Sequence, residues 1–343
     1  MKKKNKIIHY LVTAFVVLLF LAAFLWAIFN LLDFSSPLND VEFGVTFSHK
    51  YATEDLGLDW RQAYLAILDD LGVKNLRLVA PWDWVEKEKD IYNFSDLDWM
   101  FAEAGKRDVA IVLAIGRRTP RWPECHDPSW LSSLTSLEQD QKLLALVERS
   151  VIHFKKYPNL KMWQVENEPF LSFFGECPAP NHELIAKEVK LVKLLDRRPV
   201  MVTDTGELSN WRTAGTLADV LGVTMYKIVW NNLTGVWRYP WPPAYYYFKA
   251  QNIKRHNPSI GQVIVSELQA EPWNINGENI THFKIKDQYH LFDLKDFKRN
   301  LVYVKKAGFP TAYFWGVEWW YWLKTEKDEP DFWNAAKAIW QKQ

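Results

Sequence analysis

The chain begins with one long apolar segment, and from about residue 41 onward strand-like and helix-like patterns alternate. Eight strand-like runs lie at Glu42–Phe47, Asn75–Val79, Val109–Ala114, Lys161–Glu166, Pro199–Thr203, Val220–Met225, Gln262–Ser266 and Thr311–Trp315. Helical patterns lie at Trp60–Leu71, Leu97–Lys106, Leu137–Lys155, His182–Leu194, Ala214–Ala218, Tyr245–Lys254, Leu291–Lys306 and Asp331–Gln341. This alternation predicts an α/β protein with a parallel sheet.

With 343 residues, the chain is long enough for that sheet to close into a (β/α)8 TIM barrel over residues 41–343. An open, doubly wound sheet is the structural alternative. No Gly-x-Gly-x-x-Gly motif or phosphate loop follows the first strand, so a nucleotide-binding fold has no support.

The N-terminal segment has the pattern of a membrane anchor. Four lysines within residues 1–6 precede a predominantly apolar run over residues 7–32, longer than the ~20 residues that cross a bilayer. A cleaved signal peptide has an apolar core of only about 7–15 residues and a small-residue cleavage site. We therefore predict a single-pass protein with a cytoplasmic basic tail (1–6), an uncleaved transmembrane signal anchor (7–32) and a short linker (33–40). The barrel is expected on the extracytoplasmic side, close to the membrane.

Composition narrows the possible partners. The net charge is +1, with no long basic run beyond the N-terminus, which argues against nucleic acid because phosphate binding needs concentrated positive charge. The chain has 19 tryptophans, which either pack in the core or form aromatic platforms in an open cleft. We expect a monomer.

The chain has two cysteines, Cys125 and Cys177, each in a proline-containing stretch. In an extracytoplasmic domain such a pair suggests a disulfide, which would join the two loops if they are neighbours. A metal site is less favoured, because two cysteines without nearby paired histidines do not make a zinc site.

Candidate chemistry gathers at the predicted strand ends. In a (β/α)8 barrel the active site lies at the C-terminal ends of the strands. The fourth strand must end near Glu168 because Pro169 cannot continue a ladder, and the seventh runs into a second carboxylate, Glu267. Two such carboxylates suit glycosidic bond cleavage, which needs one carboxyl group protonated and another ionised.

The segment Asn167-Glu168-Pro169, with Glu267 ending the seventh strand, resembles clan A of the glycoside hydrolases, which are (β/α)8 enzymes that retain anomeric configuration. The resemblance implies that Glu168 is the general acid/base and Glu267 the nucleophile. It also implies roles in binding the sugar or orienting the nucleophile for Asn167, Arg77, Tyr226 and Trp315. No metal or organic cofactor is implied.

Other residues near the predicted mouth have two interpretations each. Trp82, His49 and Trp319 could contact the sugar, or they could pack in the core or bind a loop. Arg117 and Arg118 are expected to be solvated loop charges, with sugar binding as the alternative.

Glu166 and Glu168 alternate along one predicted strand, so their side chains are expected on the same side. We assign the acid to Glu168, which adjoins Asn167 and lies nearer the strand end. Glu166 is then expected to be a paired, supporting carboxylate.

The sequence therefore predicts a retaining β-glycoside hydrolase that acts on a carbohydrate. A barrel that binds glycan without cleaving it is the main alternative, and a mouth blocked by loops would favour it. A structural membrane protein is a third possibility, which would place Glu168 and Glu267 on different faces.

Overall fold

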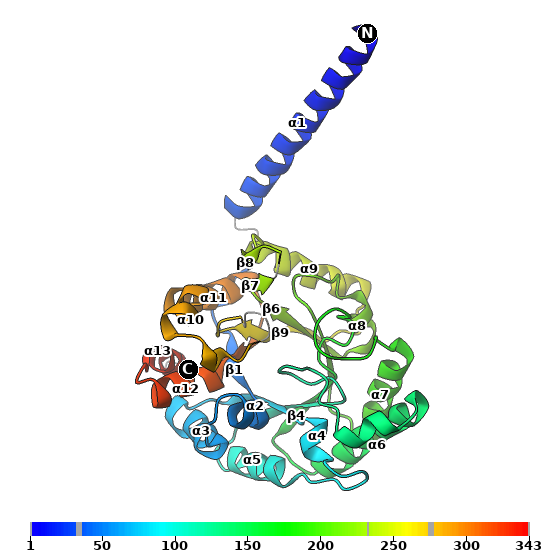
Figure 1. Cartoon of the computed structure of the whole chain (residues 1–343), viewed down its shortest axis with the longest axis vertical. Helices are drawn as coiled ribbons and strands as arrows, with labels where there is room; N and C mark the ends of the chain where they lie inside the picture. The colour runs from blue at the N-terminus through cyan, green and yellow to red at the C-terminus, as the bar shows by residue number, and fades with distance from the viewer. Residues whose placement is uncertain (1, 32–35, 232, 274–277, 342–343) are drawn as a thin grey trace.

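The computed structural model describes residues 2–31, 36–231, 233–273 and 278–341. Part of the predicted linker, residues 33–35, lies outside these ranges. Helix α1 (Lys2–Leu31) contains a 23-residue stretch, Lys6–Ile28, that is long and apolar enough to cross a membrane. No part of its most apolar window is buried against the barrel, and Figure 1 shows the helix projecting from it.

The described residues of the rest of the chain form a closed barrel of eight parallel strands (Figure 1), as predicted. Around the barrel the strand order is β1-β10-β9-β6-β5-β4-β3-β2. These strands are β1 (Glu42–Phe47), β2 (Asn75–Val79), β3 (Ala110–Ile115), β4 (Leu160–Val165), β5 (Val200–Asp204), β6 (Val220–Met225), β9 (Gln262–Gln269) and β10 (Thr311–Trp315). An antiparallel hairpin of β7 (Ile228–Asn231) and β8 (Gly235–Arg238) follows β6 and was not predicted.

The predicted helices lie outside the barrel, at α3 (Trp60–Ala66) with its π-helical continuation η1 (Ile67–Leu71), α5 (Ser95–Gly105), α6 (Ser136–Phe154), α7 (His182–Leu195), α8 (Arg212–Leu217), α9 (Pro243–His256), α11 (Leu294–Ala307) and α13 (Asp331–Trp340). The predicted helix Leu291–Lys306 is interrupted. Helix α10 (Ile285–Leu291) ends there, and Asp293 begins α11 with a capping box to Asp296.

Short helices that the sequence did not indicate follow several strands directly, at α2 (His49–Glu54), α4 (Trp82–Val85) and α12 (Val317–Glu326). Two 3-10 turns, η2 (Ser129–Ser133) and η3 (Ile280–His282), lie in the loops. These short helices affect the site, because residues that directly follow a strand end then pack within the protein instead of facing the barrel mouth.

The barrel interior is filled below the site. Arg77 of β2 pairs in register with Val112 of β3, so both side chains lie on the same face of the sheet. Val112 belongs to a buried cluster contributed by β3, β5, β6, β9 and β10, which closes the lumen: Val112, Met201, Val220, Ile264 and Tyr313. Many of the tryptophans serve the core, and the fully buried ones are Trp82, Trp163, Trp211, Trp319, Trp320 and Trp333.

Phe297 of α11 should be a main contributor to stability, because it packs on Phe314, Trp320 and Phe332 and is fully buried. We expect Phe297→Ala to lower the free energy of unfolding by about 3–5 kcal/mol. Leu194→Ala, at a position 74% exposed, should change it by no more than about 0.5 kcal/mol. Urea unfolding of the detergent-solubilised chain measures both, and equal losses would contradict this packing.

Candidate active site

Arg77 lies at the centre of the site and is fully buried inside the barrel. Its Nε donates to Gln164 Oε1 of β4 at 2.7 Å, and its Nη1 lies 3.3 Å from Thr46 Oγ1 of β1 and 3.2 Å from the Ser266 carbonyl of β9. One guanidinium group thus connects strands on opposite sides of the lumen. Its fixed fork of donors makes it well suited to hold acceptors in defined directions.

Glu267 receives hydrogen bonds on both carboxylate oxygens. Arg77 Nη1 donates to its Oε1 at 3.1 Å, and Tyr226 Oη donates to its Oε2 at 2.9 Å. Burial, and next the negative charge of Glu267, raise the pKa of Tyr226 well above its ordinary value, so the phenol keeps the proton that it donates. Strand β9 continues two residues beyond Glu267, so this side chain projects from within the strand rather than from its end.

Glu168 has a different environment. Its carboxylate Oε1 lies 3.3 Å from Thr224 Oγ1 of β6, and its backbone N–H donates to Thr203 Oγ1 of β5 at 2.8 Å. Burial, followed by the negative charges of Glu267 and Glu124, raises the pKa of Glu168 well above its ordinary value. The structure therefore favours a protonated carboxyl group at this position, which is what a general acid requires.

Asn167 links the guanidinium group of Arg77 to the carboxyl group of Glu124. Its Oδ1 accepts from Arg77 Nη2 at 2.7 Å, and its Nδ2 donates to Glu124 Oε2 at 3.0 Å. Because a side-chain amide nitrogen carries two hydrogens, Asn167 can still donate to a sugar hydroxyl, as the resemblance implies.

Two further buried carboxyl groups border the pair, and the sequence analysis missed both. Burial raises the pKa of Glu124 to about 7 against the opposing charge of Arg118. Burial likewise raises the pKa of Glu207 to about 7, although Tyr246 Oη and the Tyr226 backbone N–H donate to it. Neither residue ends a predicted strand, so no sequence signal identified them.

Glu166 is directed toward a loop. Its two carboxylate oxygens accept the backbone N–H groups of Arg117 and Arg118, at 2.6 and 2.8 Å. Strand β4 stops at Val165, and both Glu166 and Glu168 have positive φ angles of 58° and 42°. The strand alternation expected to place both side chains on one side therefore does not apply. Glu166 fastens the loop that follows β3.

This loop, residues 116–126, crosses the barrel mouth. Arg121 lies with its guanidinium carbon 3.9 Å from the ring centre of Tyr51 and 4.1 Å from that of Trp315. It also forms ion pairs with Glu271 and Glu318, which follow β9 and β10. One face of Trp315, the predicted sugar platform, is therefore covered by a protein cation.

A disulfide holds the same loop, as predicted. Cys125 and Cys177 are joined at an S–S distance of 2.07 Å, connecting the loop after β3 to the loop after β4. Arg118 is not a solvated charge, contrary to expectation. It is 4% exposed and donates to the carbonyl groups of Leu171 and Phe174 in the second loop. Arg117 pairs with Asp127.

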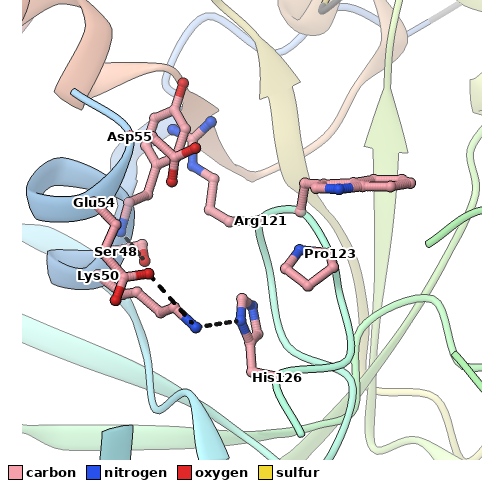
Figure 2. Close-up of a pocket in the computed structure, with 9 residues that line it drawn as sticks. Ser48, Lys50, Glu54, Asp55, Arg121, Pro123 and His126 are labelled. Atoms are coloured by element: carbon pink, nitrogen blue, oxygen red, sulfur yellow. Dashed lines mark hydrogen bonds and ion pairs between the residues drawn. The ribbon is translucent and has the colours of Figure 1, made fainter. Parts of the chain in front are cut away.

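Beside Arg121 lies a cavity of about 220 Å³ (Figure 2), which neither Glu168 nor Glu267 lines. Its lining residues are Ser48, Lys50, Tyr51, Glu54, Asp55, Arg121, Trp122, Pro123 and His126. Burial, and next the charge of Lys50, lower the pKa of His126 to about 3, so its ring is neutral.

An aromatic series runs from this cavity toward the nucleophile candidate. The ring of Trp122, 47% exposed, lies 5.7 Å from that of Phe174, which lies 5.7 Å from that of Trp273. Trp273 meets Tyr226 edge-on at 5.1 Å. These four rings follow four different strands, β3, β4, β9 and β6, so the sequence could not indicate that they assemble.

Of the residues that have two interpretations, three pack in the protein interior in this structure. Trp82 and Trp319 are fully buried, and their indole N–H groups donate to Glu86 and Gln288. His49 is 3% exposed and packs between aromatic rings, and burial lowers its pKa to about 4. All three lie in α2, α4 or α12, the short helices that turn the chain away from the mouth.

Comparison with known proteins places the fold. No family model matches the chain, and no curated protein matches it in sequence. Among solved structures, a GH5_18 protein from Bifidobacterium longum subsp. longum superposes with a TM-score of 0.57 at 15% identity, over 81% of this chain and 70% of that one. A xylanase 10B from Thermotoga petrophila, crystallised with xylobiose, has a TM-score of 0.51 at 16% identity, over 81% and 82% of the two chains.

A cold-adapted β-galactosidase from Rahnella sp. R3 has a TM-score of 0.53 at 11% identity, and this chain spans about half of its length, 51%. The chain therefore has the (β/α)8 fold of clan A glycoside hydrolases, which confirms the predicted resemblance for the fold.

Glu207 makes stability depend on pH. Since burial raises its pKa from 4.5 to about 7, the folded chain holds a proton that the unfolded chain releases, and stability falls as pH rises between these values. The raised pKa of Glu207 should lower the free energy of unfolding by at most about 3 kcal/mol between pH 4.5 and 7, and Glu207→Gln should abolish this decrease. Urea unfolding at pH 4.5 and 8 measures this, with the exposed Glu176→Gln as control. An unchanged pH dependence in Glu207→Gln would contradict the raised pKa.

Proposed function

We propose that this protein is a retaining β-glycoside hydrolase. The observation that carries the proposal is the contrast between two buried carboxyl groups in one barrel mouth. Glu267 accepts hydrogen bonds from a guanidinium group and a phenol, whereas the surroundings of Glu168 raise its pKa. Retaining hydrolysis needs this division between an ionised nucleophile and a protonated acid.

In the proposed mechanism, Glu267 attacks the anomeric carbon while Glu168 gives its proton to the departing glycosidic oxygen. This forms a covalent glycosyl–enzyme ester and leaves Glu168 ionised. Glu168 then takes a proton from a water molecule as that water attacks the same carbon, which frees the sugar and restores both side chains. Arg77 and Tyr226 hold Glu267 in place, and Asn167 donates to the sugar 2-hydroxyl.

For the substrate we propose a β-linked glycan or oligosaccharide. Structural neighbours were crystallised with GlcNAc, with Manβ1-4GlcNAc and with xylobiose, which supports this class. The exposed Trp122 and the rings that continue from it to Tyr226 offer apolar surface for pyranose faces.

One observation favours the alternative of a glycan-binding barrel. Glu168 and Glu267 are only 6% and 3% exposed, and the loop bearing Arg121 crosses the mouth. Hydrolysis therefore requires this loop to shift when substrate enters, whereas binding at the aromatic rim does not.

We further propose that α1 anchors the protein in a membrane, with residues 1–6 in the cytoplasm and the barrel on the extracytoplasmic side. The apolar stretch Lys6–Ile28 and the lysines that precede it support this topology.

The proposal predicts different defects for the two glutamates. On a panel of aryl β-glycosides, Glu168→Gln should lower kcat/KM by about 10²–10⁴-fold. Glu267→Ala should abolish turnover, and azide should restore it with inversion of the product, because a small anion can occupy the space of the lost carboxylate. Glu176→Gln is the control, since it is exposed in a loop. Full activity in Glu168→Gln or in Glu267→Ala would contradict the proposed catalytic roles.

If the unaltered chain cleaves none of these glycosides but binds an immobilised glycan, the non-catalytic alternative is supported. Binding should then fall in Trp122→Ala and persist in Glu267→Ala, since Trp122 is the exposed ring at the rim.

A further inference from the structure

Positive charge is concentrated on one side of the barrel. Helices α9 and α11 pack against each other, and together they carry eight lysine and arginine residues against one acidic residue, the buried Asp296. One of the eight, Lys249, donates to the carbonyl groups of Gly206 and Ser209, which leaves seven for the outer surface. The whole chain has a net charge of only +1, so the remaining residues are net negative. A near-neutral protein therefore has one strongly basic face.

The basic residues of α11 share the exposed side of the helix. Lys295, Arg299, Val302 and Lys306 are exposed, and their spacing of three or four residues places them in one row, with the exposed Lys298 beside Arg299. On α9 the exposed residues include Phe248 and Arg255.

The β7–β8 hairpin adds apolar surface at one end of this face. Leu233 is 93% exposed, Val236 41% and Trp237 44%. Arg238 binds the hairpin to the first turn of α11 through Asp296, at 3.2 Å. Exposed leucine and tryptophan beside cations are typical of surfaces that meet the headgroup region of a bilayer.

The chain that leads to α1 leaves the barrel at the same face. Ser36 Oγ lies 3.3 Å from Tyr247 Oη of α9, and the Leu38 N–H donates to the Lys305 carbonyl of α11 at 3.0 Å. From Leu31 to Ser36 the chain can extend by no more than about 18 Å. Figure 1 shows α1 meeting the barrel beside β7, β8 and α9.

We propose that the exposed side of α9, α11 and the β7–β8 hairpin, called here the membrane face, docks on the anionic headgroups of the bilayer that α1 spans. The inference rests on the proposed anchoring, which supplies both the lipid surface and its proximity. Because α9 and α11 flank the barrel wall, docking lays the barrel on its side. The mouth then opens along the membrane rather than away from it.

Single added cysteines in the full-length chain test this, because both native cysteines form the disulfide. Leu233→Cys, labelled with an environment-sensitive fluorophore, is compared with Leu137→Cys on α6, at a position 69% exposed. The chain is reconstituted in nanodiscs of phosphatidylcholine and phosphatidylglycerol that contain nitroxide-labelled lipid. We expect a blue-shifted, strongly quenched probe at 233 and an unshifted, weakly quenched probe at 137.

Two matched double variants test whether the positive charges of α11 contribute to docking. Lys295→Glu/Lys298→Glu on α11 should reduce quenching at 233 several-fold, whereas Lys187→Glu/Lys190→Glu, the same spacing on exposed positions of α7, should not. Quenching should also fall in nanodiscs of phosphatidylcholine alone.

Equal emission and quenching at 233 and 137 in the incorporated chain would overturn the membrane face and leave the anchoring intact. If Lys295→Glu/Lys298→Glu leaves the quenching at position 233 unchanged, the electrostatic part of the docking is overturned. A chain that does not enter nanodiscs at all would overturn the anchoring and this inference together.

Discussion

The buried guanidinium group of Arg77 is the interaction on which both the barrel and its site depend. A charge taken out of water is tolerated only when it is paired and hydrogen-bonded, and Arg77 satisfies this through Glu267, Asn167, Gln164 and the strand β1. The same contacts fix the positions of the nucleophile candidate and of the amide beside the acid candidate. Burial of one cation thus couples the closure of the sheet to the geometry of the mouth.

The loop after β3 is held above this centre by an independent set of interactions. Glu166 accepts its backbone N–H groups, the Cys125–Cys177 disulfide joins it to the loop after β4, and Arg121 pairs with carboxylates on the far side of the mouth. Enclosure by this loop removes water from Glu168 and Glu124, which raises their pKa values. The loop therefore both restricts access to the pair and creates the environment that favours the protonated form of Glu168.

The sequence predicted the barrel because eight strand-like runs alternate with helical patterns along the chain, which is typical of a parallel sheet with helices between its strands. It placed Glu168 and Glu267 near one another because Pro169 ends one strand and a carboxylate interrupts another. It could not predict the direction of His49, Trp82 and Trp319, since short helices after the strands turn these side chains inward.

Residues of irregular loops, Glu124 and Arg121 above all, have no periodic signal. Their positions depend on partners far apart in sequence, such as Asn167 and Glu318. The two helices of the basic membrane face can be recognised in the sequence, because they contain many lysine and arginine residues and one acidic residue. Only the fold shows that these helices are neighbours and that the chain leading to α1 contacts both of them.

The division of roles between the two glutamates is tested most directly by trapping the covalent intermediate. The chain is incubated with a panel of activated 2-deoxy-2-fluoro-β-glycosides, digested and analysed by mass spectrometry. The account predicts one fluoroglycosyl adduct, on the peptide that contains Glu267 and on that side chain, with loss of the adduct in Glu267→Ala. An adduct on another residue, or hydrolysis of the parent glycoside with inversion and without any adduct, would contradict it.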